Sequence, residues 1–139
     1  MKSGHYLVVE PDRSVRWELV DHDGWLDRLY QIIGCDCVES VRTVDPGLLL
    51  IIDESGRLKD PPKQHNRGAS NFYLGWLRMR QAPWDIVGTA LFAAEVPAGN
   101  IYGEWTWGPV TDPLVLEFIS DMLGVDLPPL PDREVSADD

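Results

Sequence analysis

The segment that most constrains the fold is the apolar run Leu48–Ile52, which reads LLLII. Turn residues bound it on both sides, with Pro46-Gly47 before it and Asp53-Glu54-Ser55-Gly56 after it. Five consecutive apolar residues are too few for a helix, but they suit a strand that is buried on both faces. The run therefore predicts a central strand, and other elements of the chain have to bury both of its faces.

Periodic patterns predict the elements around this strand. Alternation or short apolar runs indicate further strands at His5–Glu10, Val15–Val20, Cys35–Val44, Ile86–Ala94 and Ile101–Trp107. Helical spacing of apolar residues indicates helices over residues 25–33, with Asp21 or Asp23 as N-cap and Gly34 as C′ residue, over residues 69–80, and from the N-cap Thr111 to Gly124. This order predicts an α+β fold, with a single mostly antiparallel sheet and about three helices packed on it.

The length of 139 residues predicts one domain, over residues 1–124. Residues 125–139 are rich in proline and acids, and we expect a flexible, disordered tail there. No apolar stretch approaches the ~20 residues that cross a membrane, and the N-terminus does not resemble a signal peptide. With two cysteines, we expect a cytoplasmic protein with reduced thiols.

Charge is distributed unevenly along the chain. The formal net charge is −11, yet residues 57–80 hold six basic residues and one acid, so they carry +5 and the remainder carries −16. An acidic protein is a poor sequence-independent binder of DNA or RNA, because such binding rests on neutralising phosphates. We therefore expect no direct nucleic-acid binding, and a local anion site or docking patch at the basic segment.

The candidate ligand-binding residues lie in the proline-stiffened loop at the start of this segment. They are Arg57, Lys59, Lys63, His65, Asn66 and Arg67. Asn66 or Ser70 could cap the following helix, which would place Arg67 at the helix N-terminus, where amides and basic side chains attract phosphate or carboxylate groups. The alternative is an ordinary helix start with solvated charges.

Other reactive residues give weaker patterns. Cys35 and Cys37 are too few and too closely spaced for a structural zinc site, so we expect two small buried residues in a core strand, with no metal and no cofactor. Asp53 and Glu54 could hold Mg²⁺ or act as acid and base, but adjacent acids are also common in turns. His65 lies beside no nucleophile signature, which leaves an exposed loop histidine as the simpler interpretation. No catalytic residue is predicted.

Trp105 and Trp107 flank Thr106, so in a strand both rings lie on one face. Such pairs usually cover a core. They also mediate association between chains, so a homodimer through this edge is the leading functional alternative.

Three segments together resemble a known family: residues 29–34 with 38–42, residues 49–59 with Pro61-Pro62 and Asn66, and residues 86–91. They are similar to domain-of-unknown-function family 3846, small proteins of phages, plasmids and actinobacteria. The similarity spans about residues 19–91, with a short match at Thr111-Asp112. The family name gives no activity, and the resemblance implies an accessory protein of a phage or mobile element.

Two functions follow as expectations, neither of them enzymatic. In the first, the loop at residues 57–67 binds an anionic small molecule or an acidic patch on a protein, for example to sequester a nucleotide signal in host defence. In the second, the acidic surface imitates a nucleic acid and inhibits a host defence or DNA-processing enzyme. An enzyme using Asp53 and Glu54 ranks last.

Overall fold

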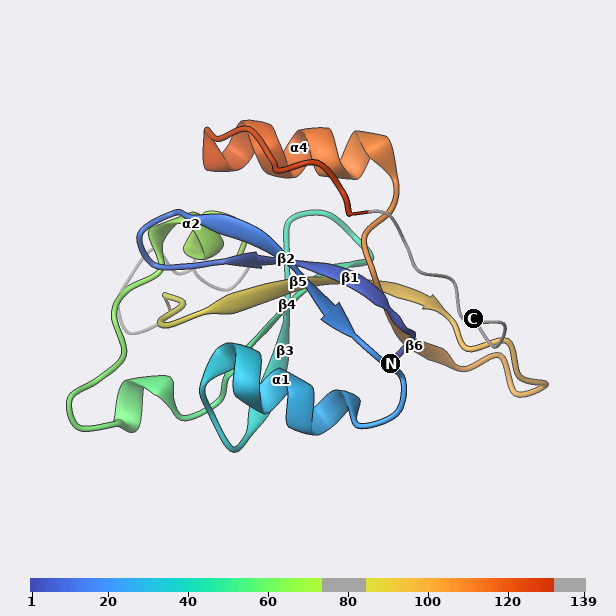
Figure 1. Ribbon diagram of the computed structural model, residues 1–139, viewed down its shortest axis with the longest axis horizontal. Helices are drawn as coiled ribbons and strands as arrows, with labels where there is room; N and C mark the ends of the chain where they lie inside the picture. Colours follow the sequence, from blue (N-terminus) through green and yellow to red (C-terminus); the bar gives the residue numbers. More distant parts are fainter. Residues whose placement is uncertain (74–84, 132–139) are drawn as a thin grey trace.

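The computed structural model describes residues 1–73 and 85–131 (Figure 1). Its strands are β1 (Gly4–Val9), β2 (Val15–Val20), β3 (Val38–Arg42), β4 (Leu48–Asp53), β5 (Ala90–Pro97) and β6 (Trp105–Gly108). They form one sheet in the order β2-β1-β5-β4-β3, and β6 also pairs with β5. Each of these pairings is antiparallel, which confirms the predicted type of sheet.

Helices cover both faces of the sheet. The described α-helices are α1 (Trp25–Ile33), α2 (Arg67–Ser70) and α4 (Pro113–Leu123), and a 3₁₀ turn, η1, spans Gly56–Leu58. Figure 1 shows α1 on one side of the sheet and α2 with α4 on the other. The α+β fold with helices packed on one antiparallel sheet is thus confirmed. None of the described helices has the length and apolarity that a membrane crossing requires.

Strand β4 lies at the centre of this arrangement. All six of its residues are buried, as expected for a strand with cover on both faces. Leu50 and Ile52 join the apolar cluster on the α4 side, together with Ile119. Ile51 points the other way and joins the cluster that contains Leu29 of α1. The alternation along one strand therefore divides the core into two layers.

The helix ends follow local chemistry that the sequence indicated only in part. Helix α1 ends as predicted at Gly34, whose φ of 73° suits glycine and whose N–H donates to Tyr30 O. Its N-cap, however, is Gly24 with no side-chain cap, so the predicted cap by Asp21 or Asp23 is wrong.

Helix α4 is also capped one residue later than predicted. Asp112, rather than Thr111, accepts the hydrogen bond from Leu114 N at 2.9 Å. Pro113 occupies the first turn, where its missing N–H is not needed. A carboxylate at this N-cap also suits the helix dipole.

The middle of the chain departs most from prediction. Strand β3 begins at Val38, so Cys35 and Cys37 precede it; the former is half-buried and the latter exposed, not buried in a core strand. Strand β5 begins at Ala90 rather than Ile86. The residues before β5 instead join the basic loop through an isolated antiparallel bridge between His65 and Val87, in which Asn66 N donates to Ile86 O and Gly88 N to Gln64 O. The helix predicted over residues 69–80 is wrong at its start, because α2 spans Arg67–Ser70 and residues 71–73 are not helical. Residues 74–80 lie outside the described residues.

The predicted tail begins later than residue 125. Val125 and Leu127 pack against the core on the α4 side. The indole N–H of Trp17 donates to Pro128 O at 2.8 Å, which satisfies a donor that needs a partner when buried. The domain therefore extends at least to Pro128, and residues 132–139 lie outside the described residues.

Candidate functional site

Two lysines of the basic loop converge on one buried carboxylate. Lys59 Nζ lies 2.6 Å and Lys63 Nζ 2.9 Å from Oδ2 of Asp53, whose side chain is 0% exposed. Neither approach has the angles of a well-aligned hydrogen bond to Oδ2. Because attraction between charges depends on distance, both contacts are nevertheless ion pairs.

The same ammonium groups also close the end of α1. Lys63 Nζ donates to Ile33 O at 2.9 Å and to Gly34 O at 2.8 Å, and Lys59 Nζ donates to Gly34 O at 3.2 Å. The carbonyls at a helix C-terminus lack partners within the helix and carry partial negative charge. The two lysines therefore join the loop, the end of β4 and the end of α1.

This arrangement sets the ionisation of Asp53. Burial alone would raise the pKa of its carboxyl group, but the close ammonium groups of the two lysines and the hydrogen bond from the Ser55 backbone N–H together lower the pKa below its ordinary value. The carboxylate also raises the pKa of Lys59. Asp53 is thus held ionised at neutral pH, which makes it a poor proton donor.

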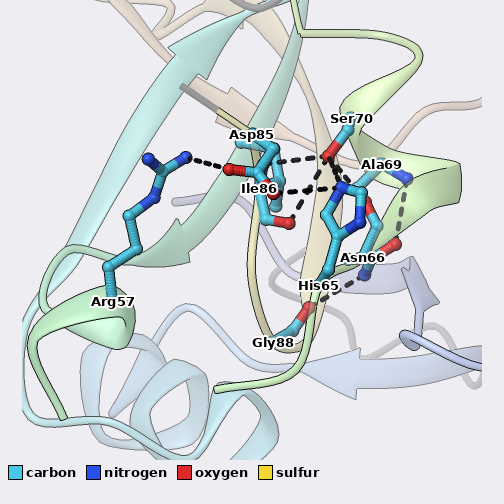
Figure 2. A network of polar contacts seen from close by, with 8 residues as sticks. All are labelled: Arg57, His65, Asn66, Ala69, Ser70, Asp85, Ile86 and Gly88. Atoms are coloured by element: carbon cyan, nitrogen blue, oxygen red, sulfur yellow. Dashed lines mark hydrogen bonds and ion pairs between the residues drawn. The ribbon is translucent and has the colours of Figure 1, made fainter. Parts of the chain in front are cut away.

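A second acid, Asp85, contacts two more loop residues (Figure 2). Arg57 Nη2 lies 3.0 Å from Asp85 Oδ1, and His65 Nε2 lies 3.1 Å from Oδ2. The acid comes from the segment just before β5, which the bridge between His65 and Val87 holds beside the loop. Four of the six predicted ligand-binding side chains thus already have acidic partners within the chain.

Ser70, His65 and Asp85 lie together, but they do not form a catalytic triad. The Ser70 Oγ is 3.3 Å and the Asp85 carboxylate 3.1 Å from the same ring nitrogen, Nε2. A triad instead needs the serine at one nitrogen of the ring and the acid at the other. The Ser70 hydroxyl is also buried and already used, since it donates to Asn66 O at 2.7 Å and accepts from Ile86 N at 2.9 Å. It has neither the access nor the orientation of a nucleophile.

The fifth predicted residue, Asn66, is entirely buried. Its Nδ2 donates to Val9 O at 3.0 Å and to Gly88 O at 2.8 Å, while its Oδ1 caps α2 by accepting from Ala69 N at 3.0 Å (Figure 2). The sequence correctly indicated the cap, whereas the contacts to two distant segments were not foreseen. The sixth residue, Arg67, is exposed at the first position of α2. That the loop binds an anion stays a prediction.

The other candidate side chains from the sequence, Cys37 and Glu54, also have partners within the protein. The Cys37 thiol donates to Glu54 Oε2 at 2.6 Å, and this contact, with a smaller effect of burial, raises the thiol pKa to about 11. Cys37 is therefore protonated at neutral pH and a weak nucleophile. Within residues 1–73 and 85–131, no group of three or more His, Cys, Asp or Glu side chains is placed to hold a metal ion.

Tryptophans form a pocket at the opposite end of the sheet. The pocket has a volume of about 250 Å³ and is lined by Met1, Trp25, Glu95, Trp105, Thr106 and Trp107. The rings of Trp25 and Trp107 are 5.9 Å apart at an angle of 84°, so they form two perpendicular walls. Glu95 pairs directly across from Trp107 in the β5–β6 ladder, which places both side chains on the face covered by α1.

The loop between β5 and β6 presents apolar side chains beside this pocket. We call residues 98–105 the hairpin tip; within it Ile101 is 92%, Tyr102 78% and Trp105 67% exposed. Asn100 orders the tip, since its Oδ1 accepts from Tyr102 N and its Nδ2 donates to Glu104 at 2.8 Å. The tip is therefore a structured loop with three large exposed side chains. An exposed group of this kind is typical of a binding surface.

Sequence reasoning found part of this second site. The spacing of Trp105 and Trp107 predicted that they share a face, which the pocket bears out. Trp25 and Glu95 were missed, because they are distant in sequence and reach the pocket only through the packing of α1 and the register of β5 with β6. If the turn between the two strands had been predicted to begin after Pro97, Glu95 would have been placed opposite Trp107.

The comparisons with known proteins identify a family but not a function. The model of a family described as a domain of unknown function (DUF3846) matches residues 1–102. No curated protein and no solved structure matches the chain. The family match confirms the resemblance carried by residues 19–91 and extends it in both directions.

Proposed function

The chain belongs to the DUF3846 family, whose description names no activity, and we propose that it acts by binding a basic protein rather than by catalysis. The hairpin tip and the tryptophan pocket form the docking surface. The observation that carries the proposal is the ordered tip, with Ile101, Tyr102 and Trp105 exposed beside a pocket edged by a carboxylate. Exposed aromatic side chains of this kind provide much of the binding energy in protein interfaces.

The charge of the molecule favours a basic partner. The chain as a whole carries −11. Near the pocket, the exposed acids Asp23, Asp27 and Glu104 lie within two residues of Trp25 or Trp105 in sequence. The nearby basic groups are the N-terminal ammonium, Lys2 and Arg42, which lies 3.7 Å from Glu95. Such a surface attracts a positively charged protein over a distance and speeds its association. A host enzyme that processes nucleic acid presents a basic face and fits this description.

The two other functions have less support. An anion at the basic loop would have to compete with Asp53 and Asp85, which already pair with the two lysines and Arg57 and contact His65. An enzyme would need a free acid, base or nucleophile. Asp53 is enclosed in ion pairs, and the Ser70 hydroxyl is fully hydrogen-bonded.

A capture experiment with matched variants tests the proposal. The immobilised wild-type protein, the tip variant Ile101→Ser/Tyr102→Ser and the control Leu114→Ser are each incubated with host lysate, and retained proteins are identified by mass spectrometry. Leu114 is also highly exposed, at 75%, but lies on α4. We expect one basic protein that the wild type and the control retain, that the tip variant loses, and that 0.5 M salt weakens, since ionic screening at roughly this strength removes attraction between exposed charges.

Four results would overturn the proposal. The tip variant could retain every partner of the wild type. The retained protein could be acidic and insensitive to salt. A panel of nucleotides and phosphates could instead raise the unfolding temperature of the wild type but not of Arg67→Ala, which would support the anion site. A homodimer through the tip would appear as loss of self-association in the tip variant by light scattering, and would replace the host protein as the partner.

A further inference from the structure

We propose that the tryptophan pocket binds an arginine side chain of the basic partner. This inference rests on the proposed function and adds the chemistry that the pocket recognises. The pocket combines three indole rings with one carboxylate, from Trp25, Trp105, Trp107 and Glu95. A guanidinium group is the protein side chain that both stacks on aromatic faces and pairs with a carboxylate in two parallel hydrogen bonds.

The indole walls provide the first half of this recognition. The perpendicular rings of Trp25 and Trp107 present the face of one indole next to the edge of the other, and Trp105 stands two residues before Trp107 on the same face. The negative faces of aromatic rings attract cations, and tryptophan does so most strongly. A planar cation can therefore stack on one indole while a second indole excludes water from its edge.

The carboxylate of Glu95 provides the second half. It is partly buried, and its Oε1 lies 3.7 Å from Nη2 of Arg42 on β3. Arg42 is 69% exposed and its pair with Glu95 is long, so this contact satisfies the carboxylate weakly. It also shows that a guanidinium reaches Glu95 from the solvent side without rearrangement of the sheet. An arginine that enters the pocket could form an ion pair with the same carboxylate.

Size and charge agree with this occupant. A volume of about 250 Å³ holds one guanidinium with part of its aliphatic chain. No Lys, Arg or His is among the residues that line the pocket. The internal cations nearest to it are the N-terminal ammonium of the lining residue Met1 and the guanidinium of Arg42, which lies 3.7 Å from Glu95. A nucleic acid or phosphate would meet a carboxylate there and be repelled, which separates this pocket from the predicted anion site.

The experiment compares an arginine peptide with its neutral isostere. Acetyl-Gly-Arg-Gly-amide and the same peptide with citrulline in place of arginine are titrated into the full-length protein. Binding is followed by the indole N–H resonances in ¹H–¹⁵N spectra, which are assigned with single Trp→Phe variants. We expect the arginine peptide to shift the resonances of Trp25, Trp105 and Trp107 with a Kd of about 1–10 mM, as for a single side chain in an open pocket. The citrulline peptide should leave them unchanged.

Variants define the role of the carboxylate. Glu95→Gln should lower the affinity for the arginine peptide at least about fivefold, since the charge-assisted hydrogen bonds lose their negatively charged acceptor. Glu117→Gln removes an exposed acid on α4, on the other side of the sheet, and should leave the affinity unchanged. Equal shifts with the citrulline peptide, an unchanged affinity in Glu95→Gln, or no shift at these three indoles up to 50 mM peptide would each overturn the inference, since 50 mM exceeds the expected Kd several times.

The two proposals fail in different ways. If the arginine peptide binds at the pocket but no partner depends on the hairpin tip, the proposed function alone is wrong. If a basic partner requires the tip but the two peptides behave alike, docking stands and the assignment of arginine to the pocket is wrong.

Discussion

At the scale of single residues, the Cys37 thiol shows how one neighbour determines reactivity. Its contact with Glu54 raises the thiol pKa to about 11, so the thiolate fraction at pH 8 is about 0.1%. We predict that Glu54→Gln lowers this pKa and raises the rate of alkylation by iodoacetamide at pH 8 at least about tenfold. The rate is measured in a Cys35→Ser background, which leaves one thiol. An unchanged rate in Glu54→Gln would mean that the carboxylate does not hold the proton on sulfur.

Asn66 is the residue whose loss should affect stability most directly. Its side chain satisfies Val9 O, Gly88 O and Ala69 N, all in the interior. We predict that Asn66→Ala lowers the free energy of unfolding by about 3 kcal/mol, because buried polar groups lose their partners. The control Asn100→Ala also removes three side-chain hydrogen bonds, but from an exposed loop, and should cost less than about 1 kcal/mol. Urea denaturation measures both, and equal losses would contradict this account.

At the scale of elements, the basic loop joins the end of α1 to the end of β4. Lys63 holds two α1 carbonyls and Asp53 and is 18% exposed, whereas Lys59 holds one carbonyl and Asp53 and is 35% exposed. We therefore predict that Lys63→Met destabilises the protein by about 2 kcal/mol and that Lys59→Met costs less. Hydrogen exchange at the last turn of α1 should accelerate more in Lys63→Met. If Lys59→Met were more destabilising than Lys63→Met, the loop would not be held to α1 and β4 mainly through Lys63.

The same scale shows what the sequence could and could not predict. Elements whose pattern is local were found: the strand over 15–20, the helix over 25–33 and the buried strand from Leu48 agree with the structure. The start of β5 was predicted wrongly, because residues 86–88 pair with the loop at 64–66. A local sequence pattern does not show which segments pair with each other. The ligand site predicted at the basic loop is untested, but its internal partners were missed for a similar reason. The acids that neutralise it, Asp53 and Asp85, reach it only through the fold.

At the scale of the whole molecule, acid and base should destabilise the protein in part through one ion-pair cluster. The pKa of Asp53 is lowered in the folded state, so its contribution is complete above the ordinary aspartate pKa of about 4 and is lost as pH falls through the folded value. The pKa of Lys59 is raised, so its contribution is complete below about 10.5 and is lost as pH rises through the folded value. Full stabilisation is therefore expected between these limits.

Because the net charge of −11 also changes with pH, the cluster is best isolated as a difference between variants. We predict that Asp53→Asn is less stable than the wild type by about 3 kcal/mol from pH 5 to 9, as for removal of one partner from a buried pair. The difference should shrink below about pH 4, where Asp53 of the unfolded wild-type chain begins to take up a proton while the folded carboxylate stays ionised to lower pH. Asp60→Asn, an exposed change in the same loop, should differ little from the wild type at every pH. Urea denaturation across this range decides the matter: a deficit in Asp53→Asn that persists unchanged to pH 2 would mean that Asp53 stabilises the fold by shape and not by charge.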